Sequence, residues 1–137
     1  MSIKKMAFIV DKMPYKSETS RLALTHAIAS QTVEIHLEDG ENVEPVLAFI
    51  GAGVLNCLKN QKASEVYGVT TLESHIQNAL LTDIKVLICE EDVKKYGLTE
   101  DQIIMDAEEL GADITSELVP FSTIMSEMES SDHILFF

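Results

Sequence analysis

Residues 82–98, TDIKVLICEEDVKKYGL, place a cysteine where a buried strand ends and a helix begins. Residues 84–88 form a short apolar run with one lysine, which is typical of a strand inside a parallel sheet. Three acidic residues follow Cys89 and favour the first turn of a helix, and Gly97 marks its end. Because ligands and chemistry collect at the carboxyl ends of strands in open α/β sheets, Cys89 is the candidate catalytic residue.

Opposing effects act on the Cys89 thiol. Unpaired N–H groups at a helix N-terminus stabilise a thiolate, whereas Glu90, Glu91, Asp92 and partial burial oppose its formation. A free cysteine also often packs as a small hydrophobic residue. Cys57 lies in a predicted short apolar helix and is expected to be protected. Cys89 is therefore predicted to be the more reactive thiol because of better access, without being strongly acidic.

The chain has 137 residues, which suits a single domain over residues 1–137. Its hydrophobic content of 46% excludes a disordered acidic chain. The N-terminal apolar run is short and is followed by Asp11, so it predicts a first strand and not a signal peptide. Cys57 and Cys89 have no metal-ligand spacing, and both are expected to be reduced thiols in the cytoplasm. We expect no bound metal.

The net charge of −13 argues against direct nucleic acid binding. No apolar run approaches the roughly 20 residues that would span a membrane. Residues 99–137 contain no Lys or Arg but ten Asp and Glu residues. Two interpretations stay open for this acidic half: a solvated face, or a surface that meets a more basic partner subunit.

Alternating strand and helix patterns predict the fold class. The expected strands cover residues 4–10, 46–50, 84–88, 114–119 and 133–137. The expected helices cover residues 18–30, 54–59, 71–81, 93–96, 105–111 and 122–128, and Thr99 with Gln102 resembles a capping box. Residues 31–38 fit either a strand or a continuing helix, and a turn over residues 38–42 ends either one, so the structure of residues 31–44 is left open. The pattern predicts an α/β domain of three layers, with a mostly parallel sheet and helices on both faces.

The loop after the first predicted strand is where a phosphate-binding site would be expected. A flavodoxin cradles phosphate here with Ser, Thr and Gly, whereas the loop DKMPYKSETS contains hydroxyl residues but no glycine. Helix capping explains these hydroxyls more simply. A flavin- or nucleotide-binding module is thus an alternative, and no cofactor is expected.

Four separated pieces resemble one family. They are KKMAFIVDKMPYKSETSRLAL, FIGAGVLNCLKNQKA, TDIKVLICEEDVKKYGL and SDHILFF. Their order and spacing resemble the DsrE/DsrF/DsrH sulfur-relay proteins, most closely the DsrF/TusC-like branch. The second piece commonly reads FxGDGV in that family, and Ala52 stands here in place of its Asp.

The resemblance implies a small α/β fold of flavodoxin-like appearance. It also implies a homo-oligomer, or a hetero-oligomer with DsrE-like or DsrH-like subunits, that exchanges persulfide sulfur with donor and acceptor proteins. The pathway would be sulfur oxidation or tRNA thiolation. Cys89 occupies the position of the sulfur-carrying cysteine of DsrE-type subunits, which implies a sulfurtransferase subunit. DsrF-type subunits often keep a similar cysteine without being the carrier, so a non-catalytic structural partner subunit is the alternative.

Overall fold

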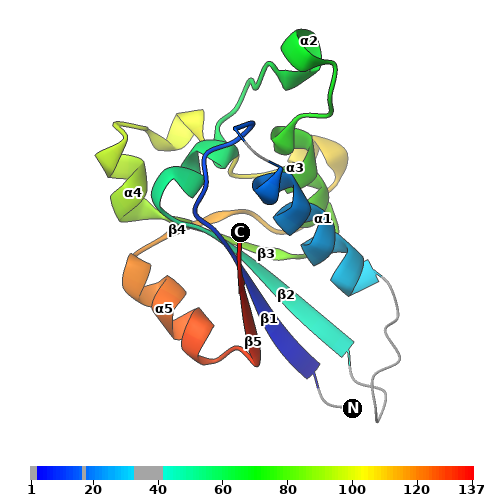
Figure 1. The fold of residues 1–137 in the computed structure, drawn as a ribbon, viewed down its shortest axis with the longest axis vertical. Helices are drawn as coiled ribbons and strands as arrows, with labels where there is room; N and C mark the ends of the chain where they lie inside the picture. Colours follow the sequence, from blue (N-terminus) through cyan, green and yellow to red (C-terminus); the bar gives the residue numbers. More distant parts are fainter. Residues whose placement is uncertain (1–2, 17, 33–41) are drawn as a thin grey trace.

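The fold is a five-stranded parallel sheet with helices on both faces (Figure 1). A computed structural model describes residues 3–16, 18–32 and 42–137. The strands are β1 (Ile3–Val10), β2 (Asn42–Phe49), β3 (Lys85–Cys89), β4 (Glu117–Val119) and β5 (His133–Phe136). Their order across the sheet is β4-β3-β2-β1-β5, and every neighbouring pair is parallel. The predicted fold class is confirmed.

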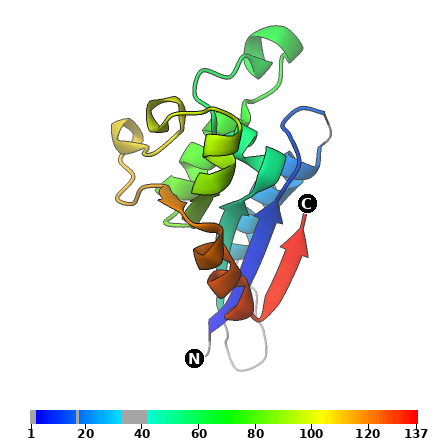
Figure 2. The ribbon, with the colours of Figure 1, turned by 90° about the vertical axis from the view of Figure 1, so that its left-hand side faces the viewer.

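Helices cover the two faces of the sheet. The α-helices are α1 (Thr19–Thr32), α2 (Ala63–Tyr67), α3 (Leu72–Leu81), α4 (Glu90–Lys95) and α5 (Phe121–Glu129). The described residues also form short 3₁₀ helices, namely η2 (Gly51–Cys57), η3 (Glu100–Gln102) and η4 (Glu108–Leu110). Helices α1 and α3 pack together on one face, and α5 lies on the other, as Figures 1 and 2 show. Helix α2 stands away from the body of the molecule (Figure 1).

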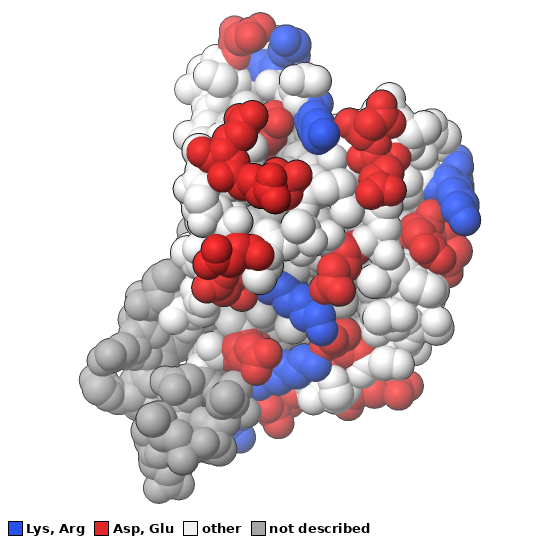
Figure 3. Space-filling view, turned by 180° about the vertical axis from the view of Figure 1, so that it is seen from behind, with Lys and Arg blue, Asp and Glu red and all other residues white. Residues whose placement is uncertain are grey.

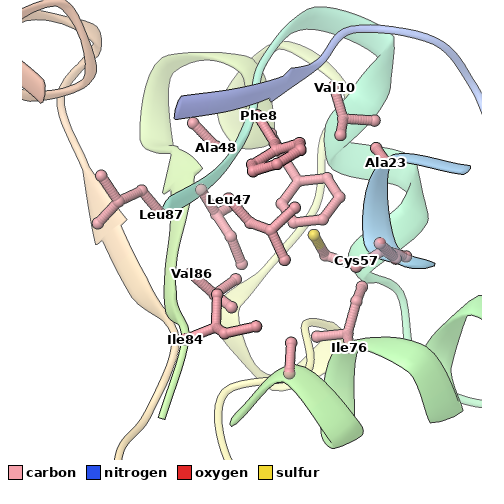
Figure 4. Close-up of a cluster of buried hydrophobic side chains, with 14 of the residues drawn as sticks. Phe8, Val10, Ala23, Leu47, Ala48, Cys57, Ile76, Ile84, Val86 and Leu87 are labelled. Carbon is pink, nitrogen blue, oxygen red and sulfur yellow. The ribbon is translucent and has the colours of Figure 1, made fainter. Parts of the chain in front are cut away.

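The core lies around the three central strands. Phe8, Leu47 and Val86 come from β1, β2 and β3, and all three are buried (Figure 4). The sulfur of Cys57 lies within this cluster. Full burial of one such apolar side chain contributes about 1.5–3 kcal/mol, so these central strands supply much of the stability that fixes the sheet.

Helix α5 is fastened to the sheet by charges. Glu127 accepts hydrogen bonds from Lys5 of β1 and from Lys85 of β3, the latter over 2.5 Å. Burial raises the pKa of Glu127, but the hydrogen bonds from Lys5 and Lys85 outweigh this effect and hold the pKa below its usual value.

Carboxylates are spread widely over the face seen from behind, with a few Lys and Arg side chains among them (Figure 3).

Several predicted element boundaries are wrong near the site. Helix α4 begins directly after Cys89, three residues earlier than predicted, because the acidic first turn includes residues 90–92. Residues 54–59 were predicted as a helix, and the structure has η2 over Gly51–Cys57 instead. Strand β2 begins at Asn42, four residues earlier than predicted. The ambiguous segment 31–38 and the turn predicted over 38–42 fall largely outside the described residues.

The segment before β4 also differs from its predicted structure. Only Glu108–Leu110 of the helix predicted over residues 105–111 is helical, as η4. Ile104 N–H donates to Cys57 O over 2.8 Å, and Ser116 N–H donates to Met105 O over 2.6 Å. Because the N–H of Ser116 pairs with Met105 and not with β3, β4 begins only at Glu117 and has three residues. The predicted capping box is confirmed, since Gln102 Oε1 accepts from Thr99 N–H over 2.9 Å.

Candidate functional site

Cys89 lies at the carboxyl edge of the sheet, as the sequence predicts. It is the last residue of β3 and the N-cap of α4, with an extended backbone at φ −68° and ψ 113°. Its Cα is in register with that of Val119, the last residue of β4. The thiol therefore lies between the ends of β2 and β4, where the chain reverses on either side.

Acidic residues in the first turn of α4 form hydrogen bonds with the chain after β2 and after β4. Asp92 Oδ2 accepts a hydrogen bond of 2.7 Å from the N–H of Gly51, two residues after the end of β2. Gly51 has φ +52°, a left-handed conformation that favours glycine and turns its N–H toward the helix. The carboxylate of Glu91 accepts from the N–H of Phe121, where α5 begins, at 3.1 Å. These acidic residues thus tie neighbouring chain segments over the end of β3.

Both thiols are buried in this chain. Cys89 is 1% exposed and Cys57 is 0% exposed. The prediction that Cys57 is protected is confirmed. The predicted access of Cys89 is wrong for the isolated chain, because the position at a strand end does not leave the sulfur open. A reagent reaches Cys89 only after its surroundings move.

The surroundings of Cys89 also favour the neutral thiol. Burial raises its pKa to about 11, the N–H of Asp92 lowers it, and the carboxylates of Asp92 and Glu91 raise it. A thiol with a pKa of about 11 is ionised in roughly one molecule in ten thousand at pH 7. Burial raises the pKa of Cys57 well above its ordinary value. In this structure Cys89 is therefore a buried and neutral thiol.

Gly53 fixes the turn over residues 51–53, called here the glycine corner, which Asp92 binds through the N–H of Gly51. A Cβ atom on Gly53 would lie 1.9 Å from Val10 O and 2.7 Å from Val10 C. Ile50 N–H also donates to Val10 O over 3.0 Å, so η2 is pressed against the end of β1. The sequence GAG predicts a sharp turn here, but it does not reveal this contact. The bond between Asp92 and Gly51 was also not predicted, since an acidic residue in a first helical turn needs no distant partner.

The loop after β1 offers little to a phosphate. It borders a shallow pocket of about 440 Å³ formed with Ala52. Ser20 is 1% exposed, and its hydroxyl donates to Lys12 O over 3.3 Å. Asn56 Nδ2 donates to the same oxygen over 2.9 Å. The Ser20 hydroxyl is thus used to close the loop. Over the described part of the chain, no group of three or more His, Cys, Asp or Glu residues is placed to hold a metal ion.

Comparisons with known proteins identify the family of this chain. The family model described as DsrE/DsrF-like matches residues 4–137. This chain belongs to the DsrE/DsrF-like family. Its fold is similar to that of the ychN protein from E. coli, known from a crystal structure, with a TM-score of 0.68 and 17% sequence identity. The match covers 98% of this chain and 99% of that one. No curated protein matches in sequence.

Family membership confirms the resemblance at the level of the DsrE/DsrF-like family, and the DsrF/TusC-like branch stays a prediction. Ala52 replaces the Asp expected in the glycine corner, yet a carboxylate is present there because Asp92 reaches it from α4. No helix among the described residues combines the length and apolar character needed to cross a bilayer.

Proposed function

We propose that this chain is a subunit of a cytoplasmic sulfur relay that accepts sulfane sulfur on Cys89 and passes it to another protein. The supporting observation is the position of Cys89, at the β3–α4 junction of a DsrE/DsrF-like chain. The relay belongs to a pathway of the sulfur-oxidation or tRNA-thiolation type. Its partners are a persulfide donor, a thiol acceptor and further subunits of the same family.

Sulfur transfer through Cys89 needs no net oxidation. The Cys89 thiolate attacks the terminal sulfur of a donor persulfide, forming a new S–S bond as the donor's S–S bond breaks. The donor leaves as a thiolate and takes up the proton that Cys89 lost. An acceptor thiolate then attacks the terminal sulfur on Cys89 in the same way, and Cys89 returns to its starting state. Each step therefore exchanges one S–S bond for another.

Burial of the thiol makes docking part of this mechanism. Cys89 is 1% exposed, and Asp92 joins α4 to Gly51 beside it. A partner that displaces the first turn of α4 breaks this hydrogen bond and admits the donor. In the isolated chain the same closure protects the thiol from oxidation, which requires access to the thiolate. We therefore expect loading to be faster with a protein donor than with a small persulfide of equal concentration.

A second candidate is a non-catalytic subunit that shapes a partner's active site. The burial of Cys89 and its pKa of about 11 favour this candidate, because a plain packing cysteine has both properties. The two candidates agree on family and partners. They differ in whether sulfur ever resides on Cys89.

A labelling and chase experiment separates these candidates. The protein is mixed with a persulfide donor carrying ³⁵S in its terminal sulfur, and the label is mapped by peptide and then chased with an unlabelled thiol acceptor. A carrier places the label on the peptide with Cys89, and the acceptor removes it. Label confined to Cys57, or no label on either peptide, contradicts the carrier role and leaves the non-catalytic subunit.

A further inference from the structure

Helix α2 exposes large apolar side chains at one end of the molecule. Val66 and Tyr67 are each 66% exposed, and Val69, which follows the helix, is 42% exposed. Ala63 is the only buried residue of α2, and the helix stands away from the body of the molecule (Figure 1). Neighbouring apolar side chains that remain exposed mark a site of interaction more often than scattered ones do. The exposed side of α2 is therefore a candidate contact surface.

A shallow pocket lies between α2 and the loop that follows β1. Its volume is about 390 Å³. Apolar and aromatic side chains line it from the loop, from η2 with the residue after it, and from α2, namely Pro14, Tyr15, Leu55, Leu58, Val66 and Tyr67. The rings of Tyr15 and Tyr67 have centroids 6.4 Å apart, so the loop and the helix meet here. This cavity, called here the α2 pocket, has room for an apolar side chain of a partner.

Hydrogen bonds fix the α2 pocket in the free chain. Gln61 Nε2 donates to Asn56 O over 2.8 Å and to Leu58 O over 2.9 Å. The hydroxyl of Tyr15 donates to Gln61 Oε1 and accepts from the N–H of Leu72 over 2.9 Å. Tyr15 has φ +66°, which is uncommon for a residue other than glycine, and these bonds hold it in that conformation. Because the pocket is preformed, a partner binds there with little loss of conformational entropy in this chain.

Lysines surround the α2 pocket, although the chain as a whole is strongly acidic. Lys59 and Lys62 line the pocket, and Lys12 and Lys16 line the neighbouring pocket beside Ala52. Among the described residues that line these two pockets, Asp11 is the only carboxylate. The whole chain, by contrast, has 23 Asp and Glu residues against 10 Lys and Arg residues. The charge of this surface is therefore opposite in sign to the net charge of the chain.

The acidic neighbours of these lysines leave them able to bind a partner. Lys12 Nζ lies 2.7 Å from Asp11 Oδ1, and Lys62 Nζ lies 3.9 Å from Glu65 Oε1. Both pairs lie at the surface, where ion pairs are weak because water and salt screen them. A carboxylate of a partner can therefore replace either acidic neighbour.

We propose that the α2 pocket binds a segment of another protein in which an apolar side chain lies between carboxylates. The apolar side chain enters the pocket beside Tyr15 and Tyr67, and the carboxylates lie against Lys16 and Lys62. Aromatic side chains at the centre of an interface contribute much of its binding energy. Opposite charges at the rim accelerate the encounter and exclude basic partners. The proposal stands whether or not Cys89 carries sulfur.

The test begins with a selection of short random peptides displayed on phage, with the wild-type chain as bait. Enriched peptides are expected to place Phe, Leu or Trp between Asp or Glu residues, because the α2 pocket is apolar and its rim is basic. The absence of any enrichment, or enrichment of peptides rich in Lys and Arg, would overturn the proposal.

The affinity of the most enriched peptide is then measured by fluorescence polarisation. Tyr67→Ser and Lys62→Glu are each expected to weaken binding at least about tenfold. The matched controls are Tyr96→Ser and Lys95→Glu, which change exposed residues at the end of α4. Their affinity for the peptide is expected to equal that of wild type. Circular dichroism of each variant checks that the fold is retained.

Binding at another site, or by a second copy of the chain, would contradict the proposal. Equal losses in the controls, or binding that survives both Tyr67→Ser and Lys62→Glu, would place the peptide elsewhere on the chain. Sedimentation of the protein without peptide tests for a second copy as the occupant. If Tyr67→Ser lowers the mass in solution, a second copy covers the α2 pocket and the proposal fails.

Discussion

Asp92→Asn is expected to lower the pKa of Cys89 by about one unit and to raise its alkylation rate at pH 8 about tenfold. The carboxylate of Asp92 opposes the thiolate both by its hydrogen bond with the thiol and by its charge. An asparagine removes the charge, while its oxygen can still accept from Gly51 N–H and its amide can donate to a thiolate. The change therefore alters electrostatics more than packing.

The measurement is the rate of Cys89 alkylation by a small iodoacetamide reagent from pH 7 to pH 11, followed by peptide mapping. The folded protein is expected to show its inflection at lower pH in Asp92→Asn than in wild type. Glu90→Gln is the matched control, because it removes one charge from the same turn without touching the thiol or Gly51. An equal shift in both variants, or none in Asp92→Asn, would contradict the role given to Asp92.

Asp92→Ala separates the effect of the Asp92 charge on Cys89 from the effect of its hydrogen bond with Gly51. Alanine removes both the charge and the bond of 2.7 Å to Gly51 N–H, so the corner is expected to open more often. Its alkylation rate should exceed that of Asp92→Asn at every pH. If the two variants instead react equally fast, the hydrogen bond to Gly51 does not limit access to Cys89.

Gly53→Ala is expected to destabilise the fold by about 3 kcal/mol or more. The added Cβ would lie 1.9 Å from Val10 O, a backbone atom that cannot rotate away. Either η2 or the end of β1 must shift, and Val10 and Val54 are both fully buried in the core. The expected loss is a large part of the 5–15 kcal/mol typical of a domain.

Urea unfolding followed by circular dichroism measures this loss. Gly68→Ala is the control, because a Cβ there meets nothing within 4 Å and only the positive φ of +67° opposes it. That control is expected to cost about 1–2 kcal/mol. A Gly53→Ala protein as stable as the control would show that the corner is not tightly packed.

The sequence predicts the sheet well because its strands are strongly patterned. The runs before Asp11 and Cys89 are apolar on both faces, as central parallel strands require, and the structure buries both. Helix α2 had no such signal. Only Ala63 among its five residues is buried, so no apolar periodicity reveals it. Pattern thus predicts elements that face the core and misses those that do not.

The candidate site was likewise predicted only in part. Local signals place Cys89 at the β3–α4 junction, and the structure agrees. The chain next to it is held by contacts between residues far apart in the sequence, such as Asp92 with Gly51 and Glu91 with Phe121. Neither pair leaves a mark in the local pattern. Sequence reasoning therefore predicts where the thiol of Cys89 lies, but not that it is almost fully buried.

Intact mass after exposure to a persulfide donor tests the central claim most directly. Wild type, Cys89→Ser and Cys57→Ser are treated with donor under native conditions, and each mass is compared with that of the untreated protein. The account predicts a gain of about 32 Da, one sulfur atom, in wild type and Cys57→Ser and none in Cys89→Ser. A gain retained in Cys89→Ser, or no gain in wild type even with a protein donor, would contradict it.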